Sequence, residues 1–145
     1  MGAMSDYWEN KVIDHLFRNT SYTAPTALYV ALFTAAPSDS GGGTEVSGGS
    51  YARTALAQST TNWANTQASG SGASTGTGGT TSNSVAITFP APTANWGTVT
   101  HVAAFDASSA GNMYFWAALT TSKTVNNGDA APSFAIGALT FQIDS

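Results

Sequence analysis

Apolar residues follow a helical period near the start of the chain and a strand-like period after it. Trp8, Val12 and Leu16 recur at every fourth position and would form one apolar stripe along a helix. Ser5 can cap the start of this segment, because a serine side chain accepts a hydrogen bond from the free backbone amides of a first turn. We therefore predict an amphipathic helix over about residues 6–18.

Beyond residue 26 the apolar residues alternate or run continuously over short stretches, separated by glycine, proline and asparagine, as in a β-rich chain. Strands are predicted over Ala27–Phe33, Tyr51–Gln58, Val85–Phe89, Thr98–Phe105, Met113–Leu119 and Leu139–Ile143. The first of these is apolar throughout, which indicates burial on both faces. In the fourth, strict alternation would place Val99 on the same face as Ala103 and Phe105.

Many short strands joined by turns are typical of an antiparallel β-sandwich or a jelly-roll-like barrel, here with one N-terminal α-helix. We expect residues 5–145 to form a single, mainly β domain. Residues 67–84 contain little besides small and polar residues. They are expected to form a flexible exposed loop, because this composition cannot bury enough surface to offset the entropy lost on ordering. Residues 1–4 are interpreted as a cloning remnant and are left out of the predicted fold.

Charged residues are scarce. Hydrophobic residues make up 42% of the 145 residues, but charged residues make up only 8%, against about 25% in ordinary soluble proteins. The net charge is −4, and the cations Lys11, Arg18, Arg53 and Lys123 are scattered. Nucleic-acid binding and electrostatic membrane anchoring both need clustered cations, so neither is expected. No apolar run approaches the roughly 20 residues of a transmembrane helix, so membrane insertion is not expected either.

Residues that carry chemistry are few and dispersed. The chain has no cysteine, and neither His15 nor His101 has acidic neighbours at the spacing of metal ligands. His101 lies among apolar residues of a predicted strand and is interpreted as a structural histidine. No Gly-x-Ser-x-Gly sequence follows a predicted strand and opens a helix. Glu45 and Arg53 flank a Gly-rich turn and can form an ion pair that holds the loop. We expect no catalytic residue, metal or cofactor; the enzymatic alternative is a small hydrolase with an unrecognised site.

Two features are the expected contact sites. The stripe of Trp8, Val12 and Leu16 either packs on the protein's own sheet or docks on a partner subunit, since so short a helix is marginal without a surface to pack on. Trp63 borders the predicted loop and is the best candidate for an exposed ring that contacts a ligand. Core packing is nevertheless the favoured interpretation for this tryptophan.

Four stretches form a recognisable series: TALYVALFTAAPSD at Thr26–Asp39, GTEVSGGSYARTA at Gly43–Ala55, the segment Asn95–Asp129 with NWGTVTHVAAFD and YFWAALTTSKTVNNGD, and the closing GALTFQID. In this order they resemble a family of small bacteriophage virion proteins, which are described as tail-fibre-like or minor structural proteins. The resemblance extends from about Asp6 to Asp144.

The resemblance implies a non-enzymatic, homo-oligomeric part of the virion that is assembled in the bacterial host cytoplasm and bound to other virion proteins. The function it favours is a tail- or fibre-associated structural protein that contacts the host surface. A host-surface glycan is the expected ligand there, bound by a loop such as residues 67–84. The alternative is a head decoration (cement) protein that binds capsid subunits.

Overall fold

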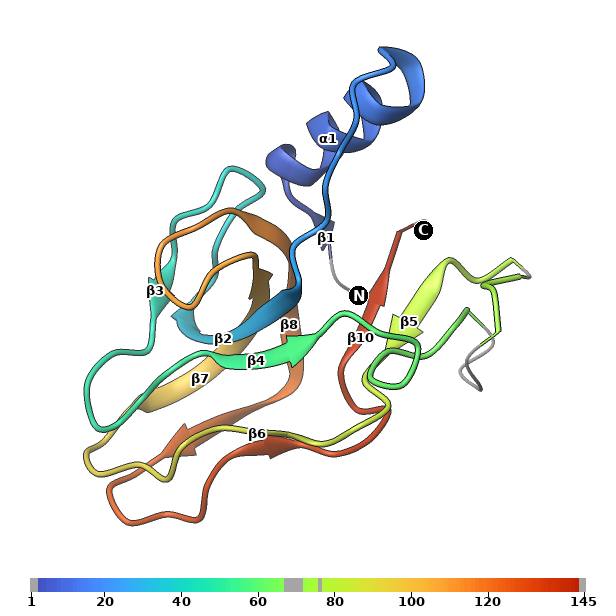
Figure 1. Ribbon diagram of the computed structural model, residues 1–145. Coiled ribbons are helices and arrows are strands. Elements are labelled where there is room, and N and C mark those ends of the chain that lie inside the picture. The colour runs from blue at the N-terminus through green and yellow to red at the C-terminus, as the bar shows by residue number, and fades with distance from the viewer. Residues whose placement is uncertain (1–2, 67–71, 76, 144–145) are drawn as a thin grey trace.

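The computed structural model of the chain describes residues 3–66, 72–75 and 77–143 (Figure 1). In chain order its elements are β1 (Ala3–Met4), α1 (Asp6–Phe17), β2 (Ala27–Ala35), β3 (Thr44–Glu45), β4 (Thr54–Ala57), β5 (Thr80–Ser82), β6 (Ile87–Thr88), β7 (Gly97–Phe105), β8 (Met113–Val125), β9 (Ser133–Phe134) and β10 (Thr140–Gln142). The predicted mainly β class with one N-terminal helix is confirmed.

The strands form two layers. The main sheet has the order β1-β8-β7-β2-β3, and β4 also pairs with β2. Two separate ribbons, β5 with β10 and β6 with β9, pack against it. Every pairing between these strands is antiparallel. The described strands form a sandwich and do not close into a barrel, which decides between the two predicted architectures.

The main core lies between the sheet and the two ribbons. The sheet contributes residues such as Val30 and Leu32 of β2, and the ribbons contribute Ile87 and Phe141. Each of these side chains is at most 3% exposed. Removing such a side chain from water stabilises the fold by about 1.5–3 kcal/mol. The apolar periodicity of the strands therefore supplies most of what holds the two layers together.

β2 is buried on both faces, as its continuous apolar run predicted. Ala31 and Phe33 point away from the main core into a smaller apolar cluster with Ala103 and Met113. This second cluster forms because β2 lies inside the main sheet, between β7 on one side and the strands β3 and β4 on the other. A strand in that position needs apolar side chains in both directions.

An irregularity in the pairing of β7 with β8 was not visible in the alternation of residues. The register shifts between Val99 and His101. Because such a bulge interrupts the alternation of side chains, Val99 joins Val102 in the main core, whereas Ala103 packs on the opposite face. The prediction that Val99 shares a face with Ala103 and Phe105 is therefore wrong.

α1 is fastened to the main sheet by the residue that caps it. The Ser5 Oγ accepts a hydrogen bond from the backbone N–H of Trp8 at 3.3 Å, as predicted. The same buried hydroxyl donates to the carbonyl of Met113, and the Ser5 N–H donates to the carbonyl of Tyr114 at 2.9 Å. Beyond this first turn the helix projects away from both layers (Figure 1). In the described part of the chain, no helix has the length and apolar content of a membrane span.

Two short strands lie at predicted boundaries. Ala3 and Met4, left out of the predicted fold with residues 1 and 2, form β1 and pair with Trp116 and Phe115 of β8. They do so because β8 offers an unpaired edge where the chain enters α1. The predicted loop over residues 67–84 contains β5, which pairs with β10. Residues 1, 2, 67–71 and 76 lie outside the described residues.

Candidate functional site

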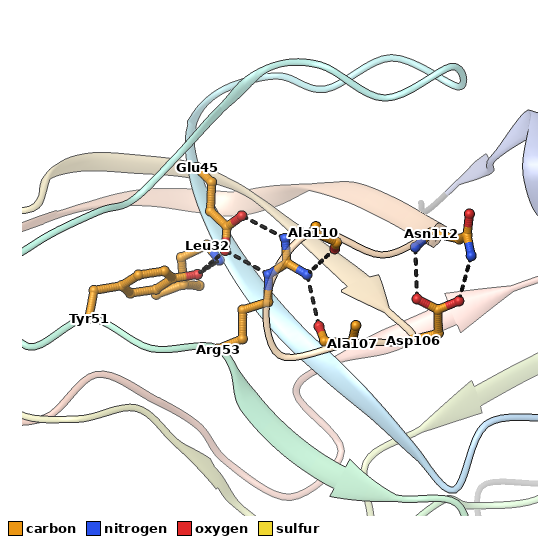
Figure 2. Close-up of polar contacts among 8 residues, drawn as sticks. All are labelled: Leu32, Glu45, Tyr51, Arg53, Asp106, Ala107, Ala110 and Asn112. Carbon is orange, nitrogen blue, oxygen red and sulfur yellow. Dashed lines mark hydrogen bonds and ion pairs between the residues drawn. The ribbon is translucent and has the colours of Figure 1, made fainter.

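Arg53 is a buried cation that joins three segments of the chain (Figure 2). Its side chain is 6% exposed. Its Nε and one terminal nitrogen each lie 2.8 Å from a carboxylate oxygen of Glu45, which completes a two-point ion pair. The other terminal nitrogen donates to the carbonyls of Ala107 and Ala110 at 2.9 and 2.8 Å. The predicted ion pair therefore exists, and it also holds the turn between β7 and β8.

The carboxylate of Glu45 accepts a further hydrogen bond in the same network. The Tyr51 hydroxyl donates to the Glu45 Oε1 at 3.0 Å and accepts the backbone N–H of Leu32 at 2.9 Å. Burial raises the pKa of Tyr51, so this hydroxyl keeps its proton. Because three donors hold it in place, the Glu45 carboxylate is a structural acceptor rather than a candidate general base.

The turn between β7 and β8 is held in one shape by its own residues. Asp106 accepts the backbone N–H of Asn112 with one carboxylate oxygen and its side-chain amide with the other, both at 2.7 Å (Figure 2). Gly111 has a φ of +76°, and a Cβ atom there would lie 2.5 Å from the Asp106 carboxylate. Glycine is therefore required at this position. The rigid turn presents its carbonyls to Arg53.

Above this network lies a cleft of about 510 Å³, which we call the loop cleft. Its walls are the first turn of α1, the loop over residues 39–43 and the turn between β7 and β8, and its floor includes Phe33 and Phe105. Asp6, Asp39 and Asn112 are exposed at its rim. The rim offers carboxylate and amide groups over an aromatic floor, which suits a hydroxyl-rich molecule.

The sequence pattern did not predict the loop cleft. Its lining comes from segments as far apart as Ser5 and Met113. The one local signal in the sequence was the run Gly41-Gly42-Gly43 beside Glu45. In the structure all three of these glycines have a positive φ. That run indicates a tightly turned loop but not which segments it will face.

Trp8 packs on the protein itself. Its ring centroid lies 5.0 Å from that of Tyr22 and 5.2 Å from that of Tyr114 on β8, and the two tyrosine hydroxyls are hydrogen-bonded to each other. Burial raises the pKa of both tyrosines. For Trp8, therefore, the contact in the structure is with its own sheet, which was one of the two predicted interpretations of the stripe.

The far end of the same helix is different. Val12 is half-buried, whereas Leu16 is 67% exposed, and its neighbours Ile13 and Phe17 are 48% and 80% exposed. We call Ile13, Leu16 and Phe17 the apolar tip. Figure 1 places the C-terminal end of α1 away from both layers. Exposed apolar side chains gathered at one place are typical of interaction surfaces.

Trp63 is half-buried and packs against the main core. The reason is local strand pairing: Trp63 forms a β-bridge with Asn83, which brings its ring within 6.2 Å of the Phe141 ring. With Phe115 and Phe141 it lines an apolar pocket of about 270 Å³. A ligand contact by Trp63 stays a prediction.

The histidines form no catalytic or metal-binding arrangement in the described residues. His101 is half-buried, and its Nδ1 lies 2.8 Å from the Thr100 hydroxyl, while its ring lies 6.0 Å from that of Trp116. His15 is exposed on α1. Residues 3–66, 72–75 and 77–143 contain no group of three His, Cys, Asp or Glu side chains placed to hold a metal ion.

A comparison with protein families identifies a match. The family model described as "Podophage GP4 fiber I protein gp80" matches residues 3–142, which is nearly the whole chain. No curated protein matches the chain.

Proposed function

Because the chain belongs to the podophage GP4 fiber I protein gp80 family and is therefore a phage fibre-type structural protein, we propose that it works without catalysis, joined to a neighbouring virion protein through the apolar tip. The earlier resemblance to tail-fibre-like virion proteins agrees with this family. A fibre role is favoured over the alternative of a head decoration protein, since the family's description is that of a fibre protein. Assembly in the host cytoplasm is part of the same proposal.

The exposure of the apolar tip carries the proposal. Ile13, Leu16 and Phe17 are between 48% and 80% exposed at the end of a helix whose first turn is held rigidly by Ser5. A partner that covered them would remove apolar surface from water and gain about 25 cal/mol for each Å² of it. Trp8, the first residue of the predicted docking stripe, holds the helix on its own sheet, and Val12 is half-buried.

The test replaces the two most exposed residues of the apolar tip. The double variant Leu16→Ser, Phe17→Ser should fold with its unfolding free energy changed by no more than about 0.5 kcal/mol, as is usual for surface positions. Its incorporation into phage particles should fall at least tenfold, measured by quantitative mass spectrometry of purified virions.

Ile136→Ser is the matched control, because Ile136 is equally exposed, at 70%, but belongs to the segment between β9 and β10. This variant should be incorporated like the unmodified chain. Normal incorporation of the α1 double variant would contradict the proposal. Light scattering of the purified chain tests whether the neighbour is a second copy of this chain. If the apolar tip joins copies in a homo-oligomer, the double variant should have a smaller mass than the unmodified chain.

A second candidate function is contact with a host-surface glycan. The loop cleft is a better candidate site for this contact than the loop over residues 67–84, which was the site expected from the sequence. Its rim combines the carboxylates of Asp6 and Asp39 with the amide of Asn112, above an aromatic floor. Sugars present hydroxyl groups that such acceptors bind.

Asp39→Asn tests the glycan contact. The amide oxygen can still accept the hydrogen bond that the Trp116 indole N–H gives to Asp39 at 3.0 Å, so the fold should be kept. Binding of the purified chain to polysaccharide extracted from the host-cell surface should weaken at least fivefold, measured by biolayer interferometry. Asp129→Asn removes the same charge from the turn after β8 and should bind normally. Equal binding by both variants would contradict a role for the loop cleft.

A further inference from the structure

A second cavity, on the side of the main sheet that faces the ribbons, belongs to neither proposed contact. It has a volume of about 380 Å³ and reaches down to Val99, Val102 and Val125, which are buried in the main core. Phe89 and Leu139 of the second layer form the opposite wall. Cavities of this size with predominantly apolar walls are typical of sites for small molecules.

The architecture explains why the core is open here. The second layer consists of two separate ribbons, so no continuous sheet covers β7 and β8. In addition, the register shift in β8 places Leu119–Ser122 opposite Thr100 alone. This bulged segment bends away from the regular ladder. Thr120 and Thr121 from the bulge line the cavity together with Ser133 of β9, which leaves a polar mouth above an apolar interior.

One cation lies at that mouth. Lys123 is exposed and lines the cavity. The other three cations have partners: Arg18 pairs with Asp14, Arg53 pairs with Glu45, and Lys11 lies over the ring of Tyr7. No ion pair or ring contact is found for Lys123 among the described residues. A cation beside an apolar cavity, in a chain of net charge −4, complements a ligand with an apolar body and an acidic head.

We propose that this cavity between β8 and β9 binds an anionic amphiphile, with its hydrocarbon chain against Val99 and Leu139 and its acidic head beside Lys123. The apolar walls supply the affinity, since each CH₂ group that binding removes from water contributes to it. The ammonium group supplies the selectivity, because a neutral or cationic head gains nothing from it. The threonine and serine hydroxyls at the mouth can donate to the same acidic head.

Three probes with one hydrocarbon chain test both parts of this proposal by calorimetric titration of the purified chain, below the concentrations at which they form micelles. Octanoate should bind at least fivefold more tightly than octanol, and octylammonium should bind most weakly. Lys123→Gln should bind octanoate and octanol equally, while leaving the affinity for octanol unchanged. Lys11→Gln removes a cation from α1 instead and should keep the preference for octanoate.

A variant that fills the mouth separates the cavity from general surface binding. Ala138 is exposed and lines the cavity, so Ala138→Trp should weaken binding of all three probes at least tenfold without unfolding the chain. Methyl chemical shifts of the unmodified chain give a second measurement that needs no variant: octanoate should move the signals of Val99, Val102 and Leu139. Non-saturating titrations, unchanged binding in Ala138→Trp, or shifts confined to other methyl groups would each overturn the proposal.

Discussion

Replacing Arg53 with methionine is expected to lower the free energy of unfolding by about 3 kcal/mol, the low end of the range for breaking a buried ion pair. The low end applies because Glu45 retains some contact with water, its side chain being 27% exposed. The loss has two causes. The carboxylate keeps its position in a partly buried site without its counter-charge, and the carbonyls of Ala107 and Ala110 lose their donor. Urea unfolding followed by tryptophan fluorescence measures the change.

Arg18→Met is the matched control, since Arg18 makes the other ion pair of the described residues, with Asp14. Those two side chains are 70% and 38% exposed. An exposed pair contributes no more than about 1 kcal/mol, so this variant should unfold almost like the unmodified chain. If the two arginine variants lose the same stability, Arg53 does not hold the three segments together in the way its contacts indicate.

Asn83→Ala is expected to lower the free energy of unfolding by a similar amount, about 3–4 kcal/mol. The reason is that each buried hydrogen bond lost costs roughly 1 kcal/mol or more. The Asn83 residue is fully buried. Its side-chain amide donates to the carbonyls of Val85 and Ala135, both at 2.8 Å, and its side-chain oxygen accepts the N–H of Leu139 at 2.9 Å. Alanine leaves all three backbone groups without that partner, in a place that water does not reach freely.

Hydrogen exchange measures both where in the structure Asn83→Ala acts and how large the effect is. The amide proton of Leu139 should exchange far faster in Asn83→Ala, because its acceptor is gone, whereas amides in the centre of β2 and β7 should change only as much as the global stability does. Asn62→Ala serves as the comparison: its amide makes a single exposed hydrogen bond, to the carbonyl of Ala57, and should matter little. Unchanged protection at Leu139 would show that Asn83 does not organise the second layer.

Asn83 also illustrates what pattern reading misses. It lies inside the stretch of residues 67–84 that was predicted to be a loop, because its neighbours in sequence are serine, threonine and glycine. Nothing local distinguishes it from an exposed turn residue. Its partners Ala135 and Leu139 are more than fifty residues away in sequence, and only the pairing of β5 with β10 brings them to it.

The exposure of the two predicted contact sites, the helix stripe and Trp63, also depends on segments that are distant in the sequence. Periodicity placed Trp8, Val12 and Leu16 on one helical face, and the structure agrees that they belong to α1. Whether each is covered depends on what lies beside the helix, and Tyr114 of β8 covers Trp8 but not Leu16. Trp63 was the candidate for an exposed ring because it lies beside the polar stretch, and its bridge to Asn83 places it against the core.

The sequence by itself determined the elements whose cause is local: the capped start of α1, the doubly buried run of β2 and the mainly β class, because caps and hydrophobic periods depend on neighbouring residues. It also contained the ion pair of Glu45 and Arg53, which are close in the chain. Only the tertiary structure decided which face Val99 occupies, that Ala3 and Met4 complete the sheet, and where the loop cleft and the cavity beside Lys123 lie. Each of these depends on strand registers and pairings between distant segments, and such long-range contacts leave no period in the sequence.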